Sequence, residues 1–250
     1  MLGAPVALQL YTVRDDTARD FAQTVRQVAA IGYAGVEFAG YGGLKPSEVR
    51  ELMDETGLQP VSTHVNLEIL ENDLTAAGEA AALIGCRYVV LSGLPQDRRT
   101  PQALRDLTPR LNDVGRHCQT LGIRFGYHNH DWEFAGASGS YLLDNLLDGT
   151  DPELVALELD VYWAAFAGVD PIGYIQQRTG RVPLVHVKDL AHDRSFTEVG
   201  DGTLDMPAIL GAARQFGSAE WYIVENDQPR NGGLESARRS LENIRAFGAV

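Results

Sequence analysis

The sequence predicts an α/β fold, a single (β/α)8 barrel formed by residues 1–250. Strand-like and helix-like segments alternate along the whole chain, which indicates a parallel sheet. Eight such units in 250 residues match the usual size of this barrel, and no change in composition marks a domain boundary. Several apolar runs of the second half also end in His, Asp or Glu, as expected where barrel strands end at an active site.

The first four units each pair a short apolar run with a segment of helical periodicity. Glycine follows several of these helical segments, as is usual where a helix ends in a left-handed residue. The predicted strands and helices are Val6–Val13 and 16–31, Gly35–Ala39 and 46–56, Gln59–Val65 and 72–84, and Arg87–Ser92 and 100–121.

The last four units continue the same pattern. Their predicted strands and helices are Arg124–His130 and 140–147, Val155–Trp163 and 171–178, Val182–Leu190 and 206–216, and Trp221–Asn226 and 234–247. A doubly wound sheet is the alternative. No strand is followed by a nucleotide-binding glycine motif, so the barrel is preferred.

Composition limits the partners. The net charge is −13 and no basic cluster is present, which opposes nucleic-acid binding. No apolar stretch reaches the roughly 20 residues that cross a bilayer, and the N-terminus lacks a secretory signal. Cys86 and Cys118 form neither a CxxC motif nor a disulfide framework, so we expect both to be buried thiols of a protein in a reducing compartment. We expect a cytoplasmic protein with a small-molecule partner, without nucleic acid or membrane.

Polar residues at the strand ends share one face of their strands. Side chains two apart point the same way, and charged groups are seldom buried unless they are paired or bind a metal. Imidazoles with carboxylates suit Zn²⁺, Mn²⁺, Fe²⁺ or Co²⁺ better than Ca²⁺. We therefore expect a polar pocket that holds a divalent metal. The pairs that share a face are His128 and His130, Glu158 and Asp160, and His186 and Lys188.

Four longer motifs carry a family resemblance. They are YHNHDWEF (Tyr127–Phe134), ELDVYWAAFAGVDP (Glu158–Pro171), GRVPLVHVKD (Gly180–Asp189) and VGDGTLDM (Val199–Met206). The chain resembles the sugar phosphate isomerase/epimerase family with the xylose isomerase-like TIM barrel, which includes inosose dehydratases, ketose 3-epimerases and endonuclease IV. The match runs from Val6 through the last strand.

The resemblance implies one divalent metal, Mn, Zn, Co or Fe rather than Mg, held by a Glu, an Asp, a His and a second Glu. Asp160, His186 and Glu225 take the last three positions. The first Glu position falls on His128, with His130 as the alternative. This departure weakens the implication of two-base epimerisation, because one of the paired carboxylates is replaced by imidazole.

The resemblance and the residue chemistry together assign the other roles. Glu225 is the first candidate for the acid–base group, and Lys188 or His130 would stabilise a developing oxyanion. For Lys188 a salt bridge to Asp189 or Glu158 is the alternative. Glu158 is predicted to pair with a barrel lysine or arginine. The predicted substrate contacts are Glu37, His64, Trp163, Tyr11 and Asp189.

The predicted activity is a metal-dependent sugar isomerase or epimerase that moves a proton next to a carbonyl through an enediolate. A keto-sugar or cyclitol dehydratase on the same scaffold is the first alternative, and a non-catalytic sugar-binding protein is the second. Endonuclease activity is disfavoured by the charge and by the six histidines in total. Homodimers and tetramers are common by family analogy, but the sequence itself decides no oligomeric state.

Overall fold

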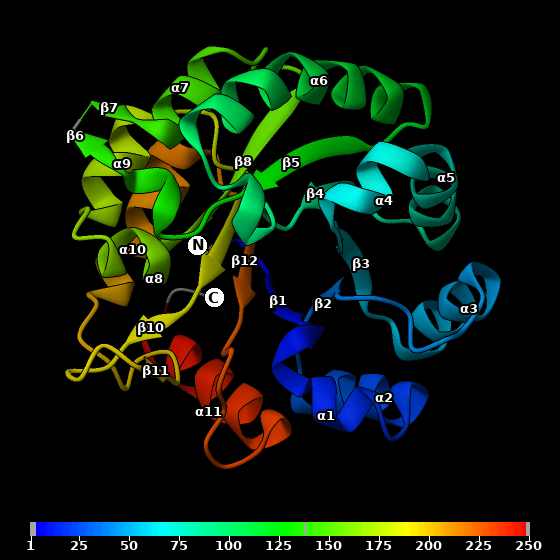
Figure 1. Cartoon of the computed structure of the whole chain (residues 1–250). Helices are drawn as coiled ribbons and strands as arrows, with labels where there is room; N and C mark the ends of the chain where they lie inside the picture. Colours follow the sequence, from blue (N-terminus) through cyan, green and yellow to red (C-terminus); the bar gives the residue numbers. More distant parts are fainter. Residues whose placement is uncertain (1–3, 138, 249–250) are drawn as a thin grey trace.

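Eight parallel strands close into a barrel at the centre of the molecule (Figure 1). The computed structural model describes residues 4–137 and 139–248. The strand order around the barrel is β1-β2-β3-β4-β5-β8-β9-β12, with β12 pairing back to β1. The predicted (β/α)8 architecture is confirmed. The strands are β1 (Val6–Gln9), β2 (Gly35–Phe38), β3 (Gln59–Val65), β4 (Tyr88–Leu91), β5 (Arg124–His128), β8 (Val155–Asp160), β9 (Leu184–Val187) and β12 (Trp221–Val224).

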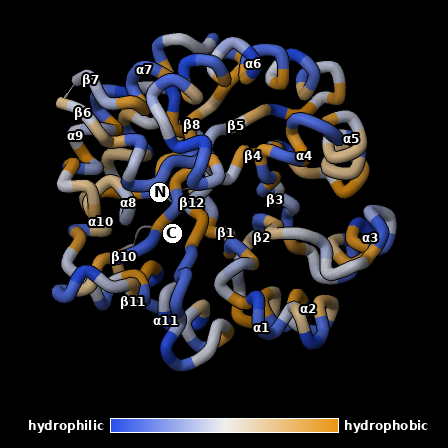
Figure 2. The backbone as a smooth tube through the Cα atoms, in the orientation of Figure 1, coloured by the Kyte–Doolittle hydropathy of each residue, from blue (hydrophilic) through white to orange (hydrophobic). Residues whose placement is uncertain are grey.

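The helices surround the strands (Figure 1). Hydrophobic and hydrophilic residues alternate along the longer ones (Figure 2), and their buried positions are mainly apolar, so these helices have an apolar face for the barrel. Asp20 caps α2 by accepting a hydrogen bond from the Gln23 backbone N–H, and Gly32 ends it at φ 105°. The helices are α1 (Arg14–Thr17), α2 (Phe21–Ile31), α3 (Pro46–Thr56), α4 (Leu67–Asn72), α5 (Leu74–Ile84), α6 (Pro101–Thr120), α7 (Leu142–Asp148), α8 (Val161–Phe166), α9 (Pro171–Gln177), α10 (Met206–Ala212) and α11 (Gly233–Ala246).

Several element boundaries differ from the sequence prediction, and four of them have a clear local reason. The strand predicted as Val155–Trp163 ends at Asp160, whose side chain accepts the Trp163 backbone N–H and caps α8. The first strand ends at Gln9, whose side chain accepts the Tyr11 backbone N–H and starts a 3₁₀ helix, η1 (Leu10–Val13). The helix predicted over 72–84 is α5, and a separate helix that was not predicted, α4, precedes it because Asn66 accepts the Ile69 backbone N–H. The strand predicted as Val182–Leu190 is β9 followed by β10 (Asp189–Leu190), which pairs antiparallel with β11 (Phe196–Thr197).

The remaining described elements are short. They are η2 (Gln96–Arg98), η3 (Trp132–Phe134), a π-helical turn η4 (Ala213–Gly217), and the antiparallel pair β6 (Gly136–Ala137) and β7 (Ser140–Tyr141).

Two separate hydrophobic clusters fill the molecule. The larger one packs the helices against the outside of the barrel. The smaller one fills the barrel interior and consists of Ala7, Val61, Tyr88, Val90, Ala156, Leu184, Trp221 and Ile223. Along β12 the inward positions run from Trp221 through Ile223 to Glu225, so the interior changes from apolar to polar towards the carboxyl ends of the strands.

Both cysteines are buried free thiols, as predicted. Among the described residues, no helix combines the length and apolarity that a membrane crossing requires.

Candidate functional site

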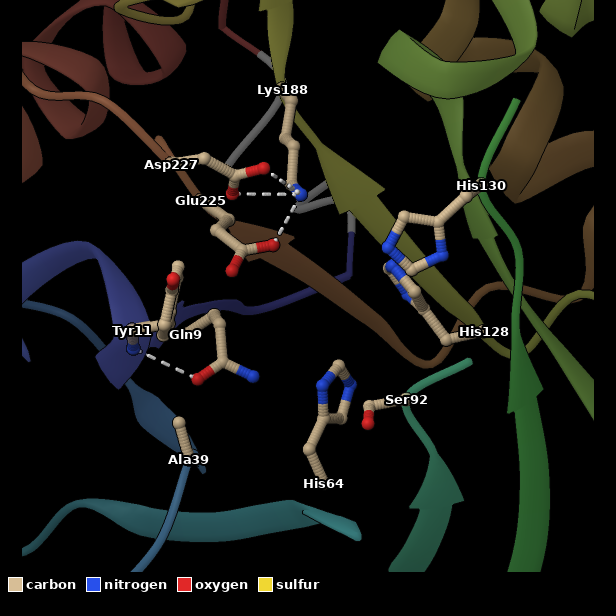
Figure 3. A pocket seen from close by; sticks show the side chains of 10 residues that line it. All are labelled: Gln9, Tyr11, Ala39, His64, Ser92, His128, His130, Lys188, Glu225 and Asp227. Carbon is tan, nitrogen blue, oxygen red and sulfur yellow. Dashed lines mark hydrogen bonds and ion pairs between the residues drawn. The ribbon is translucent and has the colours of Figure 1, made fainter. Parts of the chain in front are cut away.

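A cavity of about 410 Å³ opens at the carboxyl ends of the barrel strands. Its volume is in the range of small-molecule sites. Imidazoles lie on one side of the cavity and an ammonium with two carboxylates lies on the other (Figure 3). The lining residues are Gln9, Tyr11, Ala39, His64, Ser92, His128, His130, Lys188, Glu225 and Asp227.

Lys188 lies at the centre of the acidic side. Its Nζ is 2.6 Å from Glu225 Oε2, 3.1 Å from Asp160 Oδ2 and 3.0 Å from Asp227 Oδ1. All four side chains come from residues at or just after the ends of β8, β9 and β12. The alternative considered for Lys188, a salt bridge to Asp189 or Glu158, is wrong in its partners, because the ammonium points towards the neighbouring strand ends instead.

Three imidazoles converge on Glu158 below the cavity. Glu158 Oε2 is 2.7 Å from His64 Nε2, 2.9 Å from His128 Nδ1 and 3.2 Å from His186 Nε2. The predicted lysine or arginine partner of Glu158 is therefore wrong. Glu158 occupies an inward position one step deeper than Asp160, where histidines of β3, β5 and β9 surround it.

Glu37 completes this buried group. Its Oε1 is 2.6 Å from His186 Nε2 and 3.1 Å from His64 Nε2. Gln9 donates a hydrogen bond to Oε1 at 2.7 Å, and Ser62 donates one to Oε2 at 2.5 Å. Glu37 is fully buried and is not among the residues that line the cavity, where a substrate contact was predicted.

The pKa values of the buried carboxylates and imidazoles are shifted in different directions. Burial raises the pKa of Glu158 to about 7, and Glu37 adds to the rise. Burial would also raise the pKa of Glu37, but His64 and His186 hold it well below its usual value. Burial opposes protonation of His64, yet Glu37 and Glu158 raise its pKa to about 10. Burial and the neighbouring cations lower the pKa of His128, which favours its neutral form.

The pKa values of three side chains that line the cavity are shifted as well. Burial would lower the pKa of Lys188, but Asp160, Glu225 and Asp227 raise it well above its ordinary value. Lys188 therefore keeps its positive charge. Burial, helped by Lys188, lowers the pKa of His130 to about 3, which leaves a neutral imidazole. Burial and Glu225 raise the pKa of Asp227 to about 6.

The donor chemistry fits a divalent metal. Two groups of possible ligands share His186, and within each group the ligand atoms lie within 4.8 Å of one another. Among the described residues, Glu158 Oε1 is buried without a hydrogen-bond partner, as a carboxylate oxygen available to a cation would be. The groups are His64, His128, Glu158 and His186, and Asp160, His186 and Glu225.

The structure divides the predicted ligand set between these groups. Asp160, His186 and Glu225 lie together, but His128 Nε2 is 3.7 Å from Asp160 Oδ2, whereas His128 Nδ1 is 2.9 Å from Glu158 Oε2. His130 belongs to neither group and lines the cavity.

The remaining predicted substrate contacts lie in three different settings. Tyr11 is exposed and lines the cavity, where a wall for a sugar ring was expected. Trp163 packs on His130, with ring centroids 5.4 Å apart. Asp189, also predicted to contact substrate, is not among the residues that line the cavity. Its carboxylate accepts the backbone N–H groups of Leu190, Gly200, Gly202 and Leu204 and so holds that loop.

Sequence reasoning gave no site role to four of the lining residues, Gln9, Ala39, Ser92 and Asp227. The position of Asp227 two residues after Glu225, on the same face of the chain, was an available signal. Ser92 follows an entirely apolar strand and gave no comparable signal.

Comparison with known proteins agrees with this architecture. Residues 25–247 match the family described as xylose isomerase-like TIM barrel. The chain belongs to this family. An inosose dehydratase of Geobacillus kaustophilus is 25% identical over 247 residues, covering 82% of this chain and 80% of the relative. A solved sugar phosphate isomerase/epimerase of Parabacteroides distasonis superposes with a TM-score of 0.83 at 24% identity, covering 98% and 95% of the two chains.

A second solved structure, the IOLI protein with a bound zinc atom, superposes with a TM-score of 0.78. It is 14% identical and the match covers 97% of each chain. At these identities the structural likenesses show the fold.

Proposed function

We propose that this chain is a dehydratase that removes water from a keto-sugar or keto-cyclitol. One observation carries the proposal. Glu225 and Asp227 line the same side of the cavity and contact the same ammonium, that of Lys188. Elimination needs a base for the proton next to the carbonyl and an acid for the departing hydroxyl, and this side supplies both. The inosose dehydratase relative supports the same reaction class.

In this reaction Glu225 takes the proton next to the substrate carbonyl. Asp227 then gives a proton to the hydroxyl that leaves as water. The ammonium of Lys188 stabilises the negative charge that develops on the carbonyl oxygen, and its three ion pairs fix its position before substrate binds. Tyr11 lines the cavity and offers its exposed ring as an apolar surface to the substrate.

A divalent metal fits the two donor groups around His186. When bound, it would supply Lewis-acid polarisation of the carbonyl. The zinc in the related IOLI fold supports a metal of this kind. Mn, Zn, Co and Fe are the candidates, because imidazole and carboxylate ligands suit all of them.

The second candidate is a sugar isomerase or epimerase. His130 favours it, because this neutral imidazole lines the cavity on the side opposite Glu225 (Figure 3). A base there could return the proton to the other face of the substrate. Epimerisation would then depend on His130, whereas dehydration would depend on Asp227.

Product analysis separates the two. The protein, loaded with Mn²⁺, Co²⁺ or Zn²⁺, would be incubated with inosose and with keto-hexoses, and the products analysed by mass spectrometry and NMR. Dehydration predicts an unsaturated product that is lighter than the substrate by one water. The His130→Ala protein should still form this product, and the Asp227→Asn protein should not. A product of unchanged mass that requires His130 would replace the dehydratase with the isomerase.

Three further predictions stay as they were made from the sequence. They are the organisation of residues 1–250 as one domain, the cytoplasmic location and homo-oligomer formation.

A further inference from the structure

One buried carboxylate close to the cavity has no part in the proposed reaction. Glu133 lies in η3, after β5, and is fully buried. Among the described residues no lysine or arginine forms an ion pair with it, and its contacts are two hydrogen bonds. Burying a charged side chain is costly unless it is paired or hydrogen-bonded. The two groups that Glu133 binds therefore indicate what it is there to hold.

Glu133 ties the backbone of His130 to the barrel. Its Oε1 accepts a hydrogen bond from the Tyr127 hydroxyl at 2.8 Å, and its Oε2 accepts one from the His130 backbone N–H at 2.9 Å. Tyr127 belongs to β5 and is fully buried. The backbone of His130, two residues beyond the end of that strand, is thereby fixed relative to the strand.

The imidazole ring of His130 is held as well. It packs on Trp163, with ring centroids 5.4 Å apart, and on His128, with ring centroids 5.1 Å apart. A Cβ on Gly93 would lie 3.2 Å from Nδ1 and 3.1 Å from Cε1 of this ring. Gly93 has φ 124°, so glycine suits both its backbone and the space that the ring needs. These contacts determine which edge of the ring faces the cavity.

The two ring nitrogens of His130 have different surroundings. Nδ1 is buried, and none of the described residues forms a hydrogen bond with it. Nε2 points into the cavity, towards Lys188 on the opposite side (Figure 3). A ligand in the cavity can therefore reach Nε2 and not Nδ1.

These surroundings determine which nitrogen of His130 carries a proton. A neutral imidazole has one N–H and one lone pair. In native structures a buried N–H without an acceptor is rarer than a buried acceptor without a donor, so the proton belongs on Nε2. In the charged form both nitrogens carry a proton. Nε2 is therefore a hydrogen-bond donor in either form and has no lone pair that could accept a proton from substrate.

We propose that Glu133 is a positioning residue that holds His130 with its Nε2–H in the cavity, where this group donates a hydrogen bond to a carbonyl or hydroxyl oxygen of the substrate. The donor lies on the side opposite Glu225, so it orients the substrate for loss of a proton to that carboxylate. His130 is then not the base that an epimerase would need there. The inference rests on the proposed function only for the identity of the substrate.

Nitrogen NMR of the Zn²⁺-loaded protein, isotope-labelled in its histidines, shows the position of the proton without any turnover, and His130→Asn assigns the signal. At about pH 8, above the ordinary histidine pKa of about 6.5, His130 should carry its proton on Nε2. Glu133→Gln should keep this state, because glutamine can accept from the His130 N–H and donate to the Tyr127 oxygen. Glu133→Ala should show both tautomers, because the ring is released. His117 is the internal control, since its Nε2 is buried without a partner among the described residues and its proton should lie on Nδ1 in each protein.

A His130 proton on Nδ1 in the wild type would overturn the proposal. A single Nε2–H tautomer in Glu133→Ala would also overturn it, because Glu133 would then not be what holds the ring. If Glu133→Ala does not fold, the wild-type tautomers of His130 and His117 still decide the donor role.

Affinity for inosose or a keto-hexose, measured by calorimetry, is the second readout. His130→Ala and Glu133→Ala should weaken binding about 2- to 10-fold, the size of one hydrogen bond, and Glu133→Gln should bind within about twofold of the wild type. Equal losses in Glu133→Ala and Glu133→Gln would contradict a role exerted through His130. If neither sugar binds the wild type, the substrate assignment fails, and the NMR result still decides the role of Glu133.

Discussion

Lys188→Met tests whether the ammonium is what makes the acidic side stable. Lys188 is buried, and its Nζ contacts Asp160 at 3.1 Å, Glu225 at 2.6 Å and Asp227 at 3.0 Å. Methionine retains most of the side-chain length and removes the charge. Three neighbouring carboxylates would then be left without their counter-ion.

The expected cost follows from this geometry. Removing one partner of a buried ion pair costs about 3–5 kcal/mol, because the other charge stays buried. For a chain of this length that loss corresponds to a fall in Tm of roughly 6–20 °C. The chain has a second lysine, Lys45, which is exposed. Lys45→Met is the matched control and should change stability by less than about 0.5 kcal/mol.

Urea unfolding followed by circular dichroism at neutral pH measures both variants. If Lys188→Met lies within about 1 kcal/mol of the wild type, the carboxylates are not held by this ammonium and the reasoning is refuted. Equal losses in the two lysine variants would also refute it, since the effect would not come from the buried ion pairs.

Two further predictions concern the scaffold. Gly115→Ala places a Cβ 2.4 Å from the Leu154 carbonyl oxygen, so the free energy of unfolding should fall by about 1–3 kcal/mol. The control Gly211→Ala has open space around its Cβ and should raise the free energy of unfolding by about 0.5–1 kcal/mol. An unchanged stability in Gly115→Ala would contradict the close packing of α6. Asp189→Ala removes the acceptor of four backbone N–H groups, and amide exchange at Gly200 should become roughly tenfold faster or more; unchanged exchange would show that the loop is held by other contacts.

Periodicity was sufficient to predict the barrel, because parallel strands buried on both faces read as apolar runs between amphipathic helices. The helix over 46–56 is predicted to the residue, since Pro46 begins it and Gly57 ends it at φ 73°. Boundaries set by side-chain caps were missed. Gln9 ends β1 and Asn66 starts α4 through hydrogen bonds that hydrophobic periodicity does not reveal.

Strand parity also predicted which residues face the barrel interior. It could not give their depth along the barrel axis. Depth depends on how neighbouring strands are staggered, for example on the irregular register between Val36 and Glu37 where β2 pairs with β3. Glu37 and Glu158 therefore became partners of histidines, although one was predicted to contact substrate and the other to pair with a basic residue.

Hydrogen–deuterium exchange of the substrate is the most direct test of the central claim, that Glu225 removes the proton next to a substrate carbonyl. Inosose or a keto-hexose would be incubated in D₂O with the metal-loaded protein and followed by proton NMR. We predict loss of the α-proton signal with the wild type, and a rate about 10²- to 10⁴-fold lower with Glu225→Gln, the size of a general-base contribution. No exchange with any of these substrates, or equal rates in the two proteins, would contradict the account.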